Sequence, residues 1–232
     1  MTPREIHAIL KAIGANWLHH ANSVTTSGTF LQQGALLSRN YVAVSGLRQT
    51  SQESDDIDKH YGIWNRVFLD HVNIHKRGGR SKGGNKYGPV LFELSTDVLL
   101  QLPSGSRIEV TRANPTNWAG TTSDDQRIFT DIEDLKAKLS FGDFDKMLML
   151  QIPNERLEFP DRSVKILLDD PQRALASGEQ AFENARKHLL TIGEKSKLRV
   201  SIEKHECREG CKCVAIYRGW GQKYFDSRFS GE

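Results

Sequence analysis

The residue best placed to do chemistry is Glu158, which stands between Leu157 and Phe159. A carboxylate between two apolar residues is either half-buried beside a cleft or the outward residue of an edge strand. Phe159 precedes Pro160, so its backbone favours extended geometry and the segment before it is not expected to be helical. The solvated edge residue is the commoner of the two settings, and other features of the chain must decide between them.

Further polar side chains offer related chemistry. Glu155 lies on a more polar turn that suits substrate contact or solvation, and Asp161 is a third carboxylate in the same region. His19 and His20 are successive residues of a short expected strand, so their side chains point to opposite faces. One of these histidines can face a ligand while the other packs, and the pattern does not choose between them.

Residues 75–86 form a basic, Gly-rich segment without acidic residues. Its cations include Lys76, Arg77, Arg80 and Lys82. A basic loop can follow a phosphate backbone and release counterions on binding. It can equally be a solvated hairpin loop, with the acidic residues at 53–58 as its counterweight. Both interpretations stay open.

A second conspicuous cluster lies near the C-terminus. It consists of His205, Cys207, Cys211 and Cys213. Three sulfurs and one imidazole make a reasonable tetrahedral zinc set. The spacing of the cysteines is not a common one for zinc, however, and no second cysteine pair completes a site. A reduced turn with partly exposed thiols accounts for the pattern at least as well, so zinc is not expected.

The composition is that of an ordinary globular protein. The chain has 232 residues, 38% of them hydrophobic and 26% charged, which is enough for a sizeable core. No apolar run is long enough to cross a bilayer, and the N-terminus lacks the pattern of a secretory signal. The 3 cysteines do not make a disulfide framework. We therefore expect a cytoplasmic protein without membrane contact. Its net charge of +3 does not by itself indicate a nucleic-acid partner.

Short helices and strands alternate along the sequence. Helices are expected at 3–14, at 22–37 with Asn22 or Ser27 as N-cap and a stop at Gly34, at 57–64 as one turn, at 97–100, 132–139 and 143–150, and from Asp170-Pro171 to Gly193. Strands are expected at 17–20, 65–70, 89–94 and 107–110, around Glu158, and at 198–202 and 213–217. Residues 38–54 are expected to be a loop that presents Arg39 and Arg48. This order predicts a single α+β domain over residues 1–232, in which 194–232 can be a C-terminal extension.

Four stretches carry a family resemblance. They are His19-His20-Ala21-Asn22-Ser23-Val24 with the following residues 30–37, Gly46-Leu47-Arg48-Gln49-Thr50-Ser51, Val67-Phe68-Leu69-Asp70, and Arg156-Leu157-Glu158-Phe159. In order and rough spacing they resemble the DarT-type ADP-ribosyltransferases, bacterial toxins that modify nucleic acid using NAD. The resemblance covers residues 17–170. It implies an ADP-ribosyltransferase-like fold, in which short mixed β-sheets are split from one another and flanked by helices.

The resemblance also implies roles for particular residues. Glu158 corresponds to the family's catalytic glutamate, which stabilises the positive charge that develops on the ribose and can accept a proton from the attacking base. Arg48 corresponds to the arginine that contacts NAD, where a planar guanidinium suits the pyrophosphate, and Arg39 is the fallback. One of His19 and His20 would face the ribose.

Two further positions have competing explanations. Asn22 can bind the nicotinamide amide, although capping a helix is a simpler role. Tyr61 and Trp64 can stack on nicotinamide or on a target base, although core packing suits Trp64 better. The contact that Glu155 can make would then be with the nucleic acid.

The function implied is transfer of ADP-ribose from NAD to a base in single-stranded DNA or messenger RNA. By the same resemblance the protein would be a toxin held inactive by an antitoxin protein. One alternative is an NAD-dependent RNA 2′-phosphotransferase, which needs several basic residues around a phosphate. The other is a non-enzymatic module that binds nucleic acid through the basic segment and the Cys/His cluster.

Overall fold

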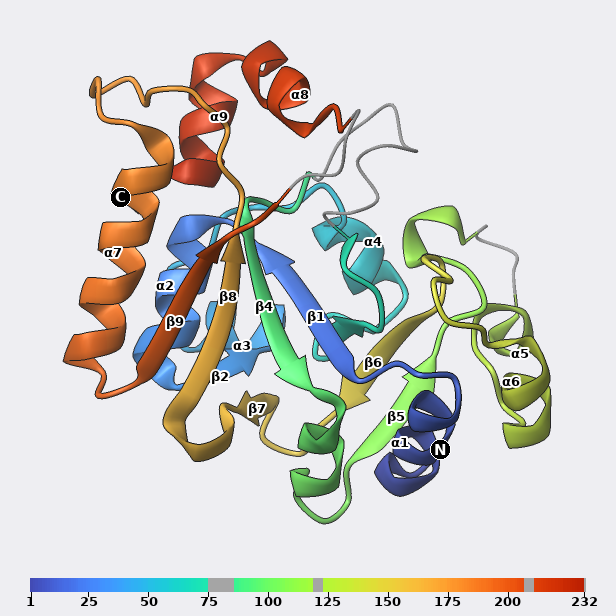
Figure 1. Cartoon of the computed structure of the whole chain (residues 1–232). Helices are drawn as coiled ribbons and strands as arrows, with labels where there is room; N and C mark the ends of the chain where they lie inside the picture. The colour runs from blue at the N-terminus through green and yellow to red at the C-terminus, as the bar shows by residue number, and fades with distance from the viewer. Residues whose placement is uncertain (75–85, 119–122, 207–210, 232) are drawn as a thin grey trace.

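The structure is a computed structural model that describes residues 1–74, 86–118, 123–206 and 211–231 (Figure 1). Within these ranges the chain forms a seven-stranded sheet and a separate two-stranded sheet, with helices around both. The predicted combination of short mixed sheets and flanking helices is confirmed. No helix in the described ranges has the length and apolar character needed to cross a membrane.

The large sheet is centred on the strand that carries the two histidines. Its spatial order is β5 (Arg107–Val110), β6 (Met147–Gln151), β3 (Val67–Asp70), β1 (Trp17–Asn22), β4 (Val90–Ser95), β8 (Ser163–Leu168) and β9 (Arg199–Lys204). Neighbouring strands are antiparallel except β8 and β9, which are parallel. The main apolar core includes Leu18, Phe92 and Ile166, one from each of three adjacent strands. Strand β1 pairs with β3 along one edge and with β4 along the other.

The small sheet pairs β2 (Ala35–Leu37) with β7 (Arg156–Glu158). Leu36 lies opposite Leu157, and both side chains are buried in the core. Since side chains alternate along a strand, Leu37 and Arg156 lie on the other face, together with Glu158. The register thus places Glu158 on the same face of the small sheet as Leu37.

Helices surround the sheets. They are α1 (Pro3–Ala12), α2 (Val24–Gln33), α3 (Arg39–Val44), α4 (Asp55–His60), α5 (Asp124–Arg127), α6 (Ile132–Lys138), α7 (Ala181–Lys195), α8 (Cys213–Gly219) and α9 (Gln222–Phe229), with 3₁₀ turns η2 (Thr96–Gln101), η3 (Pro115–Asn117) and η4 (Pro160–Arg162). Helix α2 begins where the Ser23 hydroxyl accepts the Thr26 N–H, and it ends at Gly34 in a left-handed conformation. Helices α2 and α7 pack side by side beside β8 and β9 (Figure 1).

Several local predictions are wrong. Residues 143–150 were expected to be helical, but Met147–Gln151 forms strand β6, because Leu148 and Leu150 are buried between β3 and β5. Pairing with two neighbours outweighs the helix-like spacing of these apolar residues. The N-cap of α2 is Ser23, and the expected loop at 38–54 contains helix α3.

The C-terminal part also differs from expectation. Helix α7 begins at Ala181, not at Asp170-Pro171, and it continues past Gly193, where a side chain would collide with Val200. Residues 213–217, expected as a strand, lie in helix α8. Helices α8 and α9 form a second apolar cluster around Tyr217, Phe225 and Phe229. The organisation of residues 1–232 as one domain stays a prediction.

The close approach of Gly88 to β1 gives a test of this arrangement. Gly88 has φ +138°, and an added Cβ would lie 2.4 Å from the Asn22 carbonyl oxygen. We expect Gly88→Ala to lower the free energy of unfolding by about 2 kcal/mol or more, because backbone strain and collision add up. Gly62→Ala is the control, since Gly62 has φ +67° and open space around its Cβ position. Equal losses of thermal stability in the two variants would contradict the close approach.

Candidate functional site

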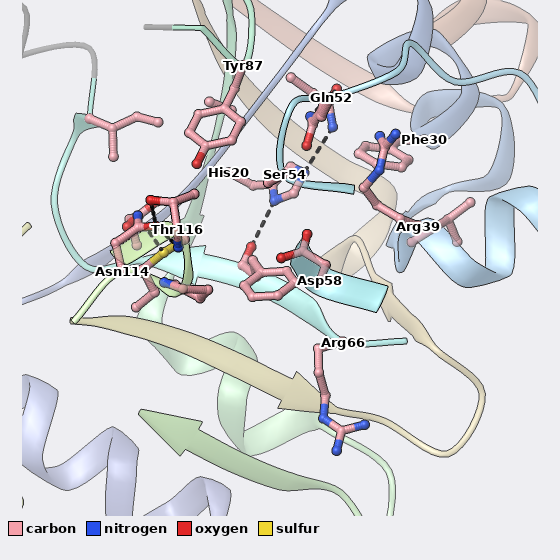
Figure 2. A pocket seen from close by; sticks show the side chains of 18 residues that line it. His20, Phe30, Arg39, Gln52, Ser54, Asp58, Arg66, Tyr87, Asn114 and Thr116 are labelled. Carbon is pink, nitrogen blue, oxygen red and sulfur yellow. Dashed lines mark hydrogen bonds between the residues drawn. The ribbon is translucent and has the colours of Figure 1, made fainter. Parts of the chain in front are cut away.

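A small cavity lies at the end of β1, beside β3 and the segment around α4 (Figure 2). Its polar lining includes His20, Asn22, Arg39, Gln52, Asp58 and Tyr87. These residues come from β1, the start of α3, the segment around α4 and the residues before β4. The cavity has a volume of about 60 Å³, which is room for a few water molecules or a small group.

His20 is held neutral in this cavity. Its Nδ1 lies 2.8 Å from the Phe68 carbonyl oxygen, and its Nε2 lies 3.3 Å from Asn22 Nδ2. A carbonyl can only accept, so Nδ1 donates and Nε2 accepts from the Asn22 amide. Burial lowers the pKa of His20 to about 4; the bond to Phe68 opposes this shift, and the charge of Arg39 adds to it. The neutral tautomer is therefore fixed at physiological pH.

Asn22 connects His20 to a neighbouring loop. Its Oδ1 accepts the Ser23 N–H at 2.9 Å and the Gln52 side-chain amide at 3.4 Å. With its oxygen so occupied, Asn22 turns its Nδ2 toward His20 Nε2, at 3.3 Å. Gln52, Asn22 and His20 thus form one chain of hydrogen bonds. The N-cap of helix α2 is Ser23, so the Asn22 side chain takes part in this chain of hydrogen bonds instead.

Arg39 and Arg66 are the two arginines that line the cavity, and Arg66 is paired with Glu109 at 3.4 Å. The Nε of Arg39 lies 2.5 Å from Asp55 Oδ1, its Nη2 lies 2.6 Å from Asp55 Oδ2, and Nη2 also donates to the Thr50 carbonyl at 3.1 Å. Its Nη1 is buried without a hydrogen-bond partner. A buried guanidinium nitrogen with no acceptor is costly, so this donor is available to a ligand.

Asp58 is a buried carboxylate on the same wall. Burial raises the pKa of Asp58 to about 6, and the negative charge of Asp55 adds to the shift, while Arg39 and Ser54 oppose it. Asp58 is 6% exposed and, like His20, lines the cavity (Figure 2). A carboxylate with this pKa can exchange a proton near neutral pH.

Glu158 lies outside this lining. Its side chain is 60% exposed and forms an ion pair with Arg156, whose Nε lies 2.9 Å from Glu158 Oε1. Arg156 is anchored in turn by its Nη2, which donates to the Gln33 carbonyl at 2.8 Å. The carboxylate is therefore accessible and oriented, on the face of the small sheet that also carries the cavity residue Leu37.

Glu155 is held within the protein. Its carboxylate accepts the Ser38 hydroxyl and, at 3.0 Å, the Asn40 side-chain amide. Its backbone has φ 55°, in the left-handed region. Asp161 is exposed with φ 49°. Among the described residues, neither of these carboxylates lines the cavity.

Arg48 and Tyr61 also lie elsewhere. The Arg48 side chain is exposed, while its carbonyl accepts the Thr29 hydroxyl at 2.6 Å. Tyr61 donates its hydroxyl to the Trp118 carbonyl at 2.8 Å, and Trp64 is half-buried under the Lys59 ammonium. The fallback arginine, Arg39, is the one that the fold places in the cavity.

His19 faces the opposite side of the sheet. It lines a separate, wider cleft, and its Nε2 lies 3.5 Å from Glu93 Oε2. The strand alternation predicted for the two histidines is thus observed, and His20 is the one that faces the cavity.

The remaining residues predicted from the sequence do not contribute to this cavity among the described residues. Lys76, Arg77, Arg80 and Lys82 lie outside the described residues, as does Cys207. Cys211 and Cys213 are half-buried, and His205 is buried beside Asp169 at 3.3 Å. Among the described residues, no three potential ligands come close enough together to hold a metal ion.

The fold adds cavity residues that sequence reasoning missed. They are Gln52, Ser54, Asp58, Tyr87, Asn114 and Thr116. The one available signal was the acidic run at 53–58, which we interpreted only as a counterweight to the basic segment. The others lie in polar segments without a periodic pattern.

Solved structures of DarT from Thermus sp. 2.9 match this chain. The complex with ADP-ribosylated ssDNA has a TM-score of 0.45 and 13% identity, over 82% of this chain and 95% of that chain. The complexes with NAD+ and carba-NAD+ have TM-scores of 0.41 and 0.42 and identities of 13% and 14%, over 82% of this chain and 96% of each of those chains. The chain is similar to DarT. No family model matches the sequence, and no curated protein matches it.

The protonation of His20 can be measured directly. We expect its NMR signals to stay those of a neutral Nδ1–H imidazole down to a pH of about 4. The unfolded protein is the control, because there His20 should titrate near its ordinary value of 6.5. As the pH falls, the unfolded state therefore binds this proton before the native state does. The contribution of His20 to the free energy of unfolding is thus complete above pH 6.5 and is lost as the pH falls toward 4. A native midpoint near 6.5 would contradict the buried neutral imidazole.

Asp58 should have the opposite pH dependence. Its raised pKa means that the native state holds the proton more tightly, so its contribution to stability is present below about pH 4 and lost as pH rises through about 6. We therefore compare the free energy of unfolding of Asp58→Asn with that of wild type at two pH values. The variant should gain on the order of 2 kcal/mol over wild type between pH 4 and pH 7.5. Urea denaturation at both pH values measures this. Asp56→Asn, whose side chain is 99% exposed, should show no such difference.

Proposed function

We propose that this protein is an NAD-dependent mono-ADP-ribosyltransferase that attaches ADP-ribose to a base in nucleic acid. The observation that carries the proposal is the convergence of His20, Asn22 and Arg39 on one cavity. Two of these residues lie in the first resembling stretch, and Arg39 follows the leucine step that ends it. The first substrates to test are NAD and single-stranded DNA, the molecules named in the DarT complexes.

The cavity offers chemistry suited to the nicotinamide end of NAD. The Asn22 amide keeps its second N–H for a ligand, and the neutral His20 that orients it adds no positive charge to oppose the nicotinamide cation. Phe30 lies with its ring centroid 5.5 Å from that of His20 and adds an apolar wall. In this proposal Asn22 and His20 hold the nicotinamide and its ribose.

Arg39 would bind the pyrophosphate. Its unpartnered Nη1 is a donor already desolvated for an anionic oxygen, and the planar guanidinium suits phosphate. A cavity of about 60 Å³ does not enclose a dinucleotide, so NAD binding must widen it. Widening at Arg39 requires the pyrophosphate to compete with Asp55 for the guanidinium.

Glu158 would stabilise the ribose cation. Cleavage of the nicotinamide–ribose bond passes through an oxocarbenium-like state, which a nearby carboxylate stabilises. Glu158 is oriented by Arg156 on the face that carries Leu37, a cavity residue. In this assignment it also takes the proton from the attacking base. The rival carboxylate is Asp58, which lines the cavity itself.

We further propose that the protein is a cytoplasmic toxin restrained by an antitoxin protein. The sequence resemblance supports this role. Expression of the wild-type chain in bacteria should then arrest growth, whereas the Glu158→Gln variant at the same protein level should not. Equal growth of both cultures would count against the toxin role and leave the transferase activity to be judged by the assay below.

The assay that tests the activity is mass spectrometry of nucleic acid after incubation with NAD. Single-stranded DNA, RNA and protein are incubated separately, and we expect an added ADP-ribose on nucleic acid together with released nicotinamide. Loss of a phosphate from RNA instead would indicate the 2′-phosphotransferase. Absence of nicotinamide release with every substrate would contradict an enzyme of this class.

Glu158→Gln should separate binding from catalysis. We expect NAD affinity within about threefold of wild type and a transfer rate lower by about 10²-fold or more, because the charge that stabilises the ribose cation is removed. Glu203→Gln is the matched control: Glu203 is 56% exposed and paired with Lys165, much as Glu158 is with Arg156. Loss of transfer in Asp58→Asn with full transfer in Glu158→Gln would move the role to Asp58.

A further inference from the structure

The loop that carries Gln52 is held between the cavity and the C-terminal helix. We define the Gln52 loop as residues 48–54. On its inner side the Thr50 N–H donates to the Thr26 hydroxyl at 2.8 Å, and Arg39 donates to the Thr50 carbonyl at 3.1 Å. On its outer side α9 supplies two contacts, from Ser227 and Arg228.

Arg228 makes the stronger of these outer contacts. Its Nη1 donates to the Ser51 carbonyl at 2.9 Å, while the Ser227 carbonyl accepts the Thr50 hydroxyl at 3.4 Å. Arg228 is only 4% exposed, and its guanidinium carbon lies 4.9 Å from the centre of the Tyr224 ring. Its Nε is buried without a hydrogen-bond partner. Burying a guanidinium with one unpaired nitrogen costs free energy that packing alone does not offset. The hydrogen bond to Ser51 is the main interaction that compensates for it.

The position of Gln52 follows from this bond. Ser51 directly precedes Gln52, whose N–H donates to Asp55 at 3.0 Å and whose side-chain amide donates to Asn22 at 3.4 Å. Asn22 in turn donates to His20. Arg228 therefore acts on the cavity through Ser51 and Gln52, without lining the cavity itself.

We infer that Arg228 is a positioning residue, which fixes the Gln52 loop so that Gln52 keeps Asn22 oriented toward His20 for ligand binding. The consequence for NAD rests on the proposed function. The consequence for the loop does not, because it concerns backbone groups whose protection can be measured without any substrate.

The chain offers a matched control in Arg173. Arg173 also binds backbone carbonyls of the C-terminal helical pair, those of Tyr217 at 2.8 Å and Trp220 at 2.7 Å, and it also lies over an aromatic ring, that of Phe225 at 4.3 Å. None of its contacts among the described residues is with the Gln52 loop. Arg173→Ala should loosen the packing of α8 and α9 and leave the loop in place.

The first measurement is amide hydrogen exchange of Thr50 and Gln52 in the full-length protein. We expect Arg228→Ala to speed exchange at both amides by about tenfold or more, and Arg228→Lys to restore part of the protection, because a lysine can still donate to Ser51. Arg173→Ala should leave both amides unchanged. Equal acceleration in the two alanine variants would overturn the inference, because it would show a general loss of C-terminal packing.

The second measurement is the steady-state kinetics of NAD turnover. Arg228→Ala should raise the KM for NAD by about tenfold with kcat within about twofold, because ligand binding loses its orienting groups while the reacting carboxylate is untouched. Arg173→Ala should leave KM unchanged. If the wild type turns over NAD and both variants share one KM, the inference fails. If the wild type shows no turnover while the exchange result holds, the proposed function fails and the anchoring role stands.

Discussion

The position of β1 at the centre of the large sheet is the constraint on which the rest of the site depends. The strand is paired on both edges, with β3 and with β4, so its register cannot slip without moving every side chain to the other face. That register sends His19 into one cleft and His20 into the cavity. The carbonyl that fixes the tautomer of His20 belongs to Phe68 of the neighbouring strand, so the protonation of the site is set by sheet pairing.

Part of the charge around the cavity is paired within a short segment of chain. Arg39 stands against Asp55 and Asp58, and the two carboxylates respond differently. Asp55 binds the Nε and Nη2 edge of the guanidinium, while Asp58 is left buried with a raised pKa. The cavity also carries Arg66 and Asp70, which come from outside this segment. An anion that displaces Asp55 would gain a preformed fork, and it would also meet the negative charge of that carboxylate nearby.

The sequence predicted the parts of this fold that depend on local pattern. The helix from Pro3, the strands at 17–20, 65–70 and 89–94, and the Gly34 stop of α2 are each signalled by periodicity or by a capping residue. Residues 143–150 were misassigned, because Met147, Leu148 and Leu150 fit a helix as well as a strand and only pairing with β3 and β5 decides. The delayed start of α7 has a similar cause, since Asp170-Pro171 is a good cap whose helix does not form there. The cavity was half predicted: His20, Asn22 and Arg39 stand near recognisable motifs, whereas Gln52 and Tyr87 reach the cavity only through contacts far apart in sequence.

The contact between Arg228 and Ser51 spans 177 residues of sequence. Contacts between distant residues form late, because the loop they close costs entropy that earlier, local contacts must first offset. On a ribosome, strand β1, the Gln52 loop and Arg39 emerge long before α9 does. The outer support of the cavity is thus absent from the nascent chain until synthesis has passed Arg228, well after the residues that line the cavity have been made.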